Sequence, residues 1–392
     1  MLIQNQYTVV AKTFHGLEQK LMLEMRDLGA VELRVGRRAV YAKANLETLY
    51  RLNLCSRLSL SFLITLNDFK AHNDEVLYKR IHQMPWESVI GLRQTIAVDA
   101  TVHSNTFTHS QFVALRCKDA IVDRLREVSG GRPSVDRESP DLRITIHVAD
   151  NAVSVGLDSS GDRLHKRGYR KQTGVAPINE VLAAGILSLA GWEGQMDFLD
   201  PMCGSGTLAV EALMMARNIP AGIFRAKYGF MEWPNFDSEL WEKVKEQALS
   251  GEKEFPHRIY ARDVDARILE AAASNITAAL LDDEIRLRRA DFVGSSSDNP
   301  VFIVMNPPYN ERLTVSEKQL YRSIGDTLKQ GYAGSVAAVF SASVEGLKSL
   351  GLRPSKKFAL YNGALPASLW LLEMYDGSRR QTGVQNKENN EG

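Results

Sequence analysis

The feature that most constrains the fold is a regular alternation of short apolar strands with helices, which begins at Pro177. The expected strands are 196–200, 258–265, 285–291, 301–308 and 335–342, and the expected helices are Ile178–Leu189, Thr207–Asn218, Ala266–Leu280 and Glu317–Gln330. Strands rich in Val, Ile and Phe that alternate with helices are typical of a doubly wound, mostly parallel α/β sheet. The last strand-like runs, 356–363 and 369–375, have no helix between them, which predicts an antiparallel hairpin at the sheet edge.

The first half of the chain lacks this regularity. Up to about Leu157, short strands and helices follow one another without strict alternation, which predicts α+β modules in front of the parallel sheet. A chain of 392 residues is longer than one hydrophobic core usually serves, so two or three domains are expected. The polar segment 376–392 is expected to be a disordered tail.

Composition narrows the class of protein. A hydrophobic share of 44% and a charged share of 24% are typical of a soluble globular protein. No long apolar run and no signal-peptide pattern occur, which predicts a cytoplasmic protein. The scattered Cys55, Cys117 and Cys203 indicate neither a disulfide framework nor a zinc site, so no metal is expected. A net charge of +1 argues against a uniformly basic nucleic-acid coat but allows a local basic patch.

The most informative motif is the turn DPMCGSGT at residues 200–207, between an expected strand and an expected helix. Open α/β sheets bind nucleotides at this place, beyond the carboxyl end of a strand and against the N-terminus of the next helix. Gly204 and Gly206 allow the backbone to approach a ligand closely. The pattern GxGxxA alone is weak evidence, and a tight turn without a ligand is the alternative.

The acidic residues near this turn indicate which of two cofactors, NAD or S-adenosylmethionine, the sequence favours. A dinucleotide-binding unit has Asp or Glu about 20 residues after the glycines, but here that neighbourhood is basic. The next strand instead ends in Asp263 and Asp265, which can bind a ribose. Asp200 suits the ammonium of a methionine group better than a pyrophosphate, and Asp291 can meet an adenine amine. The pattern therefore favours S-adenosylmethionine over NAD.

The tetrapeptide Asn306-Pro307-Pro308-Tyr309 follows the fourth expected strand of this domain. Consecutive prolines stop a strand and stiffen the chain, which suits the presentation of an amide and a carbonyl at fixed positions. Asn306 Oδ1 and the Pro307 carbonyl can accept hydrogen bonds from an exocyclic amine, and Tyr309 offers a face on which a base stacks. These four residues are the predicted catalytic group.

The predicted cofactor-binding residues share one expected sheet edge. They are Asp200, Pro201, Cys203, Gly204, Ser205, Gly206, Thr207, Asp263, Asp265, Asp291 and Asn306. A covalent role for Cys203 is not expected, because an amine nitrogen attacks a methyl group directly and needs no cysteine nucleophile.

Taken together, DPMCGSGT, RDVD, RADF and NPPY resemble the motifs of Rossmann-like amino-methyltransferases that use S-adenosylmethionine. More narrowly, LHKRGYR, FLDPMCGSGT and MNPPYNERL resemble the bacterial 23S rRNA guanine-N2 methyltransferases. The run from Phe112 to Asp141 resembles the THUMP domain that precedes the catalytic domain in that family. The resemblance covers essentially all of residues 1–375.

This resemblance implies an order of domains. They are a ferredoxin-like region at 1–60, a THUMP RNA-binding domain at 61–157, a basic linker at 158–176 and a Rossmann-like methyltransferase domain at 177–375. It also implies methyl transfer to the exocyclic N2 of a guanine in 23S rRNA. A tRNA guanine, an adenine N6 in DNA or RNA, and a role as a non-enzymatic RNA-binding assembly factor remain as alternatives.

The densest basic cluster of the chain lies at the expected domain boundary, in SSGDRLHKRGYRK. Basic side chains interleaved with an aromatic one can pair with phosphates and stack a base. From composition alone, a solvated linker is an equal alternative, and the family resemblance favours RNA contact or a lid over the cofactor. The predicted RNA-binding residues are Arg163, His165, Lys166, Arg167, Tyr169, Arg170 and Lys171.

Overall fold

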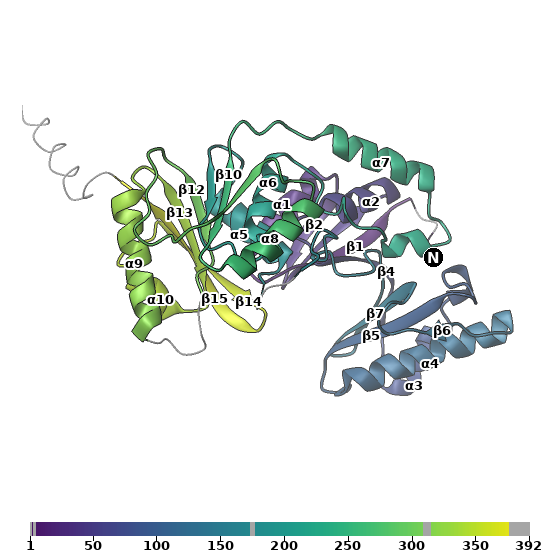
Figure 1. The fold of residues 1–392 in the computed structure, drawn as a ribbon. Helices are drawn as coiled ribbons and strands as arrows, with labels where there is room; N and C mark the ends of the chain where they lie inside the picture. Colours follow the sequence, from purple (N-terminus) through teal and green to yellow (C-terminus); the bar gives the residue numbers. More distant parts are fainter. Residues whose placement is uncertain (1, 3–4, 173–176, 309–314, 376–392) are drawn as a thin grey trace, which may run out of the picture. The chain divides into compact units, whose positions relative to one another are not determined.

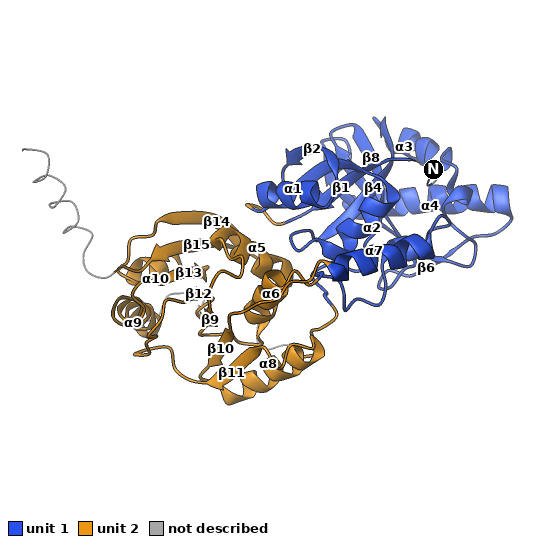
Figure 2. Cartoon of the chain, turned by 90° about the horizontal axis from the view of Figure 1, so that it is seen from above, with its two compact units in different colours: residues 1–13, 17–167, 220–250 blue, residues 14–16, 168–219, 251–392 orange. Residues whose placement is uncertain are grey.

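The computed structural model describes residue 2 and residues 5–172, 177–308 and 315–375, and it divides the chain into two compact units (Figures 1 and 2). Unit 1 comprises Met1–Thr13, Leu17–Arg167 and Pro220–Ser250, and unit 2 comprises Phe14–Gly16, Gly168–Ile219 and Gly251–Gly392. The predicted tail 376–392 lies outside the described residues. Within the described part of the chain, every helix is too short or too polar to span a bilayer.

Unit 1 is built on one eight-stranded sheet with the order β2-β3-β1-β4-β8-β7-β5-β6. Its strands are β1 Tyr7–Lys12, β2 Val31–Gly36, β3 Ala39–Ala44, β4 Ser61–Lys70, β5 Thr95–His103, β6 Ser134–Val135, β7 Leu142–Ala149 and β8 Ala152–Asp158. The strands pair antiparallel except that β5 runs parallel to β6 and β7. Its helices are α1 Glu18–Asp27, α2 Leu46–Cys55, α3 Asp74–His82, η1 Trp86–Ser88, α4 Ser110–Ser129, η2 Gly229–Glu232 and α7 Ser238–Ser250.

Buried and less buried residues alternate in this sheet, which therefore has one buried face and one open face. In β1, Tyr7, Val9 and Ala11 are buried, while the residues between them are half-buried. Successive side chains of a strand point to opposite faces of the sheet. The half-buried residues of β1 therefore all point away from the core that the helices cover. The open face therefore carries polar side chains such as Thr8 and Lys12.

The segment Pro220–Ser250 belongs to unit 1, whereas the sequence predicted a methyltransferase domain at 177–375. Aromatic packing explains its position. The ring of Phe230 stacks on Tyr50 of α2 at 4.4 Å between centroids. Trp241 of α7 meets Phe230 edge-on at 5.2 Å and Tyr50 at 5.8 Å. Such ring pairs stabilise the contact between α2 and the inserted segment beyond the area that they bury.

Unit 2 contains a seven-stranded sheet with the order β11-β10-β9-β12-β13-β15-β14. Its strands are β9 Phe198–Asp200, β10 Ile259–Asp263, β11 Ile285–Arg289, β12 Phe302–Met305, β13 Val336–Ser341, β14 Lys356–Asn362 and β15 Leu365–Glu373. The first five strands of that order are parallel, and β15 and β14 are antiparallel. The predicted α/β class, parallel sheet and edge hairpin are therefore confirmed.

Helices cover both faces of the unit 2 sheet (Figure 1). They are α5 Glu180–Ala190, α6 Thr207–Ala216, α8 Ala266–Ala278, α9 Val315–Gly331 and α10 Val344–Ser349. In Figures 1 and 2, α9 and α10 lie on one side of the sheet, and α5, α6 and α8 lie on the other. This double cover explains why all four residues of β12 are buried.

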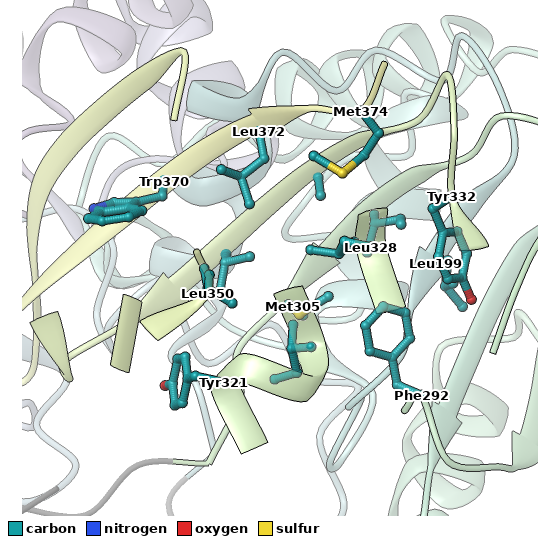
Figure 3. Packing of buried hydrophobic residues seen from close by; sticks show 14 of the residues in the cluster. Leu199, Phe292, Met305, Tyr321, Leu328, Tyr332, Leu350, Trp370, Leu372 and Met374 are labelled. Carbon is teal, nitrogen blue, oxygen red and sulfur yellow. The ribbon is translucent and has the colours of Figure 1, made fainter. Parts of the chain in front are cut away.

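The core of unit 2 reaches the end of β12 (Figure 3). Met305 belongs there to one cluster of buried side chains, which also includes Leu199 of β9, Tyr321 and Leu328 of α9, and Trp370 of β15. Because Met305 is fully buried, the place where the chain leaves the sheet at Asn306 is determined by core packing. Each such buried side chain contributes roughly 1.5–3 kcal/mol to folding.

Met305→Ala should lower the free energy of opening of the unit 2 sheet by about 2–5 kcal/mol, because it removes transfer free energy and leaves a cavity. Native-state hydrogen exchange of the β12 amides measures this change. Leu280→Ala, which truncates a side chain that is 79% exposed, should change the same quantity by less than about 0.5 kcal/mol. Equal effects of the two substitutions would contradict the assignment of Met305 to the core.

Candidate cofactor and catalytic site

The glycine turn joins β9 to α6 with two residues in the left-handed region. Gly204 has φ +52° and Gly206 has φ +83°. A Cβ placed on Gly204 would meet no atom within 4 Å, whereas a Cβ on Gly206 would lie 3.4 Å from the Cβ of Ala272 in α8. Gly204 therefore leaves open space for a ligand, and Gly206 admits close packing of α8.

A cavity of about 1180 Å³ opens beside this turn, at the carboxyl ends of β9, β10, β11 and β12. Of the predicted site residues, those that line it are Pro201, Cys203, Gly204, Ser205, Thr207, Asp263, Asp291, Asn306, Pro307 and Pro308. Parallel strands present their carboxyl ends at the same edge, so residues far apart in sequence meet here. Tyr309 lies outside the described residues.

Asp263 joins the glycine turn to the next loop. Its Oδ2 accepts the amide of Gly204 at 3.0 Å, and its Oδ1 accepts the amide of Asp265 at 3.0 Å. A carboxylate oxygen has two lone pairs, so each oxygen keeps acceptor capacity for a ribose hydroxyl. Asp263 lines the cavity and therefore fits the sugar of an adenosyl group.

Asp265 has a different role from the one predicted. It is the N-cap of α8, and its Oδ1 accepts the amide of Arg267 at 2.9 Å. Its second oxygen forms an ion pair with the Arg267 side chain at 3.5 Å. Asp265 is not among the residues that line the cavity, so its predicted contact with the cofactor stays a prediction. The side chains that line this part of the cavity are those of Val264 and Ile268.

Asp200 is fully buried at the end of β9 and does not line the cavity. Among the described residues, no side chain donates a hydrogen bond to either carboxylate oxygen. Burial raises the pKa of Asp200 well above its ordinary value, the nearby Asp263 carboxylate raises this pKa further, and the Met202 amide partly opposes the rise. A direct contact of Asp200 with a methionine ammonium is therefore not supported by this geometry.

The third carboxylate, Asp291, follows β11 and is exposed. Its Oδ1 accepts the amide of Val293 at 2.9 Å, which shapes the loop that also places Phe292 and Val293 on the cavity wall. An apolar ring beside a carboxylate suits a planar base that carries an amine.

The residues after β12 present an acceptor to the cavity. Asn306 is half-buried, and its Oδ1 has no hydrogen-bond partner among the described residues. Pro307 and Pro308 follow it and line the same cavity. A buried amide oxygen without a donor costs about 1–3 kcal/mol, so a ligand that donates to it regains that free energy.

Cys203 also lines the cavity. Burial raises the pKa of its thiol strongly, and the carboxylates of Asp200 and Asp263 raise it further. The thiol is therefore protonated at neutral pH and is a poor nucleophile.

Arg170, predicted to bind RNA, instead holds the glycine turn. Its Nη1 donates to Ser205 Oγ at 3.1 Å, and its Nη2 donates to Thr207 Oγ1 at 2.9 Å. Its Nε donates to Glu180 of α5 at 2.6 Å. Burial raises the pKa of Glu180, the Arg170 guanidinium opposes this rise, and Glu211 adds to it. The guanidinium is thus the counter-charge for a buried carboxylate and a clamp on the turn.

Asn275 of α8 completes the clamp, and sequence reasoning missed it. Its Oδ1 accepts the amides of Lys171 at 2.8 Å and Gln172 at 3.1 Å. Its Nδ2 donates to the carbonyls of Gln172 at 3.0 Å and Ser205 at 3.1 Å. All four hydrogen-bonding positions of this buried amide are occupied. A polar residue on the buried face of an amphipathic helix, next to Ala271, Ala272 and Ile276, was the available signal.

Two other predicted RNA-binding residues are also buried. Arg167 is 1% exposed and donates to the carbonyls of Arg57 at 2.7 Å and Leu164 at 3.0 Å. Tyr169 is 1% exposed and donates to Glu211 at 3.0 Å. Neither side chain can reach a base or phosphate, so these two predictions are wrong for this structure. The remaining predicted RNA-binding residues are the exposed Arg163, Lys166 and Lys171 and the half-buried His165.

These features define a class of protein. A parallel sheet with an antiparallel edge hairpin, a left-handed glycine turn, an acidic residue at the end of the second strand and Asn-Pro-Pro after the fourth strand together define a Rossmann-like methyltransferase that uses S-adenosylmethionine.

Family models agree with this class and make it specific. Residues 167–369 match the RMKL-like methyltransferase domain, residues 71–158 match the THUMP domain, and residues 8–60 match the RlmL ferredoxin-like domain. The chain belongs to the RMKL-like methyltransferase family.

Named relatives share much of this chain. It is 38% identical over 380 residues to ribosomal RNA large subunit methyltransferase K/L of Desulfotalea psychrophila, covering 93% of this chain and 52% of that protein. It is 36% identical to the Synechocystis sp. protein named Putative RNA methyltransferase slr0064, and the match covers 93% of this chain and 96% of that protein. The chain thus spans about half the length of the K/L relatives that it matches.

Solved structures share the fold. SMU.472, solved in complex with SAH, superposes with a TM-score of 0.86 at 28% identity, covering 96% of this chain and 100% of that chain. A Listeria monocytogenes protein that is predicted to be an N6-adenine-specific DNA methylase superposes with a TM-score of 0.84 at 28% identity. The match covers 95% of this chain and 97% of that chain.

Asn275→Ala should weaken binding of S-adenosylhomocysteine by about tenfold or more. The substitution leaves backbone groups on both sides of the turn without hydrogen-bond partners, and each such group costs about 1–3 kcal/mol. Isothermal titration calorimetry measures the affinity. Asn275→Asp keeps both acceptor bonds but turns a carboxylate oxygen toward the carbonyls of Gln172 and Ser205, so its affinity should fall at least as far as that of the alanine variant. Unchanged affinity in the alanine variant would show that the clamp does not shape the cofactor site.

Asp200→Asn should raise the free energy of unfolding at pH 8 and leave it nearly unchanged near pH 4. A carboxyl whose pKa is raised by folding binds its proton more tightly in the folded state. The free energy of unfolding of the unsubstituted protein therefore falls as pH rises from about 4 through the raised pKa of Asp200. The amide of the variant does not titrate, so the variant does not lose this free energy. Urea unfolding across that pH range measures the difference. A variant that is less stable at every pH would indicate that the carboxylate has a donor partner.

Proposed function

We propose that this protein transfers the methyl group of S-adenosylmethionine to the exocyclic N2 of a guanine in 23S rRNA. The observation that carries the proposal is the unpartnered Oδ1 of Asn306, which lies on the wall of the same cavity as the glycine turn. An acceptor in this position suits an amine donor, and an exocyclic amine on a planar base has that chemistry.

In this proposal, different residues around the cavity bind different parts of the cofactor and of the target base. The turn at Cys203–Thr207 holds the methionine end of the cofactor, Asp263 holds the ribose and Asp291 meets the adenine. S-adenosylmethionine supplies an electrophilic methyl group when bound. Asn306 Oδ1 and the Pro307 carbonyl accept from the two hydrogens of the target amine, which directs the nitrogen lone pair toward that methyl. The nitrogen would gain the methyl as the methyl–sulfur bond breaks and S-adenosylhomocysteine leaves, and it would then lose one proton to water, so no general base is required.

Positioning provides most of the rate in this scheme. Holding two reactants in an aligned geometry is worth up to about 7–11 kcal/mol of a barrier. Burial of β12 and the stiffness of Pro307-Pro308 keep Asn306 at one place relative to the glycine turn. The target base must leave its helix or already be unpaired, since a stacked base cannot enter a cavity.

The rRNA substrate is proposed from the relatives. Three of them, each 38–40% identical to this chain, are named as ribosomal RNA large subunit methyltransferases. The chain also carries the THUMP and ferredoxin-like matches in front of the catalytic domain. Action on rRNA would place the enzyme in the cytoplasm.

One rival activity has a specific observation behind it. The structurally similar Listeria protein is predicted to be an adenine-N6 DNA methylase, and an adenine also presents an exocyclic amine that Asn306 can accept. Methylation of a tRNA guanine and a non-enzymatic role in ribosome assembly compete with the proposal as well. Analysis of modified nucleosides in RNA from a deletion strain separates these activities. Loss of N2-methylguanosine from 23S rRNA is expected, whereas loss of N6-methyladenosine, or of a modified tRNA guanosine, would refute the proposed target.

Asn306→Ala should lower transfer of a radiolabelled methyl group to RNA by about a hundredfold or more, because it removes an acceptor that orients the nitrogen. Its affinity for S-adenosylhomocysteine should stay within about threefold of that of the unsubstituted protein. A tenfold change in affinity would require a shift of about 1.4 kcal/mol or more in the free energy of binding. Asn306→Asp keeps an acceptor and serves as the matched control. Full activity in the alanine variant would contradict the role of Asn306, and no cofactor binding by the unsubstituted protein would support the non-enzymatic role.

A further inference from the structure

One face of the unit 2 sheet is left bare at its edge. The connection from β11 to β12, residues 290–301, is described throughout and contains no helix. Helices α6 and α8 pack on one side of β10 and β11, and α8 lies beside β11 in Figure 2. On the other side of these two strands, no helix among the described residues packs to a similar extent. Parallel sheets normally have helices on both faces, so the side chains on this side are open to solvent or to a ligand.

The connection itself follows α9 rather than the edge strands. The amide of Gly294 donates to Thr327 Oγ1 at 2.9 Å, and the amide of Ser297 donates to the carbonyl of Gly331 at 2.9 Å. Thr327 and Gly331 belong to the C-terminal part of α9. These hydrogen bonds tie the connection to that end of the helix, so it does not take the place of a covering helix over β10 and β11.

Strand register gathers three arginines on this bare face. β10 and β11 run parallel, with Tyr260 opposite Arg286 and Arg262 opposite Arg288. Paired residues of neighbouring strands point to the same face of a sheet, and Tyr260 packs against the core cluster that contains side chains of α9. Arg286 and Arg288 are exposed, and Arg262 is half-buried. The alternate residues of both strands are buried or half-buried on the side of α6 and α8, namely Ile259, Ala261, Ile285 and Leu287.

Several carboxylates near these strands are engaged on the opposite side of the sheet. Asp265 is the N-cap of α8. Asp282 accepts a hydrogen bond from the hydroxyl of Thr277 in α8. Glu284 forms an ion pair with Arg217, which is the C-cap of α6. Since α6 and α8 both lie behind the bare face, these carboxylates do not neutralise its arginines.

The bare face keeps an excess of positive charge when its borders are included. The borders carry the exposed carboxylates of Asp283, Asp291 and Asp298 and the exposed guanidinium groups of Arg258 and Arg289. Counted with the three on the face, the arginines are five and these carboxylates three. None of the three arginines on the face forms an ion pair with any residue that the structure describes. A local surplus of this kind attracts an anion.

The bare face also borders the cofactor cavity. Val264 and Asp291, which follow β10 and β11, line that cavity, and Arg289 Nε donates to the Val264 carbonyl at 3.0 Å. In the strand order, β10 is two strands and β11 three strands away from β12. Neighbouring strands lie about 4.8 Å apart, so the two strands lie roughly 10–15 Å from Asn306 along the sheet edge. Over that distance a nucleic-acid strand carries about three or four phosphates, at about 3.4 Å each.

We propose that the bare face of β10 and β11 binds the sugar-phosphate backbone of the RNA strand that carries the target base, with phosphates at Arg262, Arg286 and Arg288. The inference rests on the proposed function, because it takes the substrate to be RNA. It assigns this contact to the methyltransferase domain, outside the matched THUMP and ferredoxin-like modules. A guanidinium group can hold a phosphate through two parallel hydrogen bonds. Such contacts carry no sequence information, so they position the strand while the base is recognised in the cavity.

The first test measures initial rates of methyl transfer by the full chain to an unmodified transcript of 23S rRNA. The variant Arg286→Gln with Arg288→Gln should raise KM for the RNA by about tenfold and leave kcat within about twofold. A residue that binds substrate and transition state equally changes KM alone, and these arginines lie away from the reacting atoms. The matched control, Arg353→Gln with Lys356→Gln, removes two charges from exposed positions at the other edge of the same sheet. Its KM should change by less than about twofold.

The second test measures binding without catalysis, by fluorescence anisotropy with a fluorescein-labelled single-stranded RNA of about 15 nucleotides at several salt concentrations. The glutamine pair should lower the slope of log K against log salt by about 1.4, which is two phosphate contacts at about 0.7 each. The variant Arg286→Lys with Arg288→Lys keeps both charges and should retain the slope of the unsubstituted protein. The control pair at the other edge should retain it as well.

Calorimetry with S-adenosylhomocysteine shows whether the variants are folded, and all should keep the affinity of the unsubstituted protein. If the glutamine pair loses that affinity, the single variant Arg288→Gln decides the question, with an expected fall in slope of about 0.7. An unchanged slope, an equal change in the control pair, or a loss that the lysine pair does not restore would overturn the proposal. A transcript that is not methylated at all would instead count against the proposed function, and the salt dependence of binding would still decide the role of the bare face.

Discussion

The cofactor site depends on how the glycine turn is held. A turn with two left-handed residues has little intrinsic rigidity, since glycine loses more backbone entropy on folding than any other residue. Here the Asp263 carboxylate holds the amide of Gly204, and Asn275 holds the carbonyl of Ser205. Arg170 holds the hydroxyls of Ser205 and Thr207. These contacts come from three separate segments of the chain, so the site is preorganised only when unit 2 is complete.

Sequence reasoning succeeded where one periodicity decides the structure. The alternation of strands and helices predicts the parallel sheet, and the ends of its strands bring Asp263, Asp291 and Asn306 to one cavity. It failed where burial decides the role of a polar residue. Arg167 and Tyr169 have the composition of an RNA-binding segment but lie in the interior, and a linear pattern does not distinguish a solvated charge from a buried, hydrogen-bonded one. Asp265 illustrates a related ambiguity, because an acidic residue before a helix can be a cap as well as a ligand.

The same limitation hides a hollow on the open face of the unit 1 sheet, which is lined in part by Lys12, Arg34 and Lys43. Lys12, Arg34, Lys43 and Arg163 are spread over about 150 residues of a chain with a net charge of +1, and no window of sequence makes them a cluster. Strand pairing gathers them, because β1 and β3 lie next to each other and β4 lies beside β1. A balanced total charge therefore does not show how cations and carboxylates are distributed over one face of a sheet.

The insertion of Pro220–Ser250 into unit 1 has a consequence for synthesis on the ribosome. The chain leaves unit 1 at Arg167, returns at Pro220 and leaves again after Ser250, so the partners of Tyr50 at Phe230 and Trp241 emerge late. At about 5–20 residues per second, the 83 residues from Gly168 to Ser250 take roughly 4–17 s to make. During that interval the aromatic surface of α2 lacks its cover, and transiently exposed apolar surface makes a partly folded chain prone to aggregation.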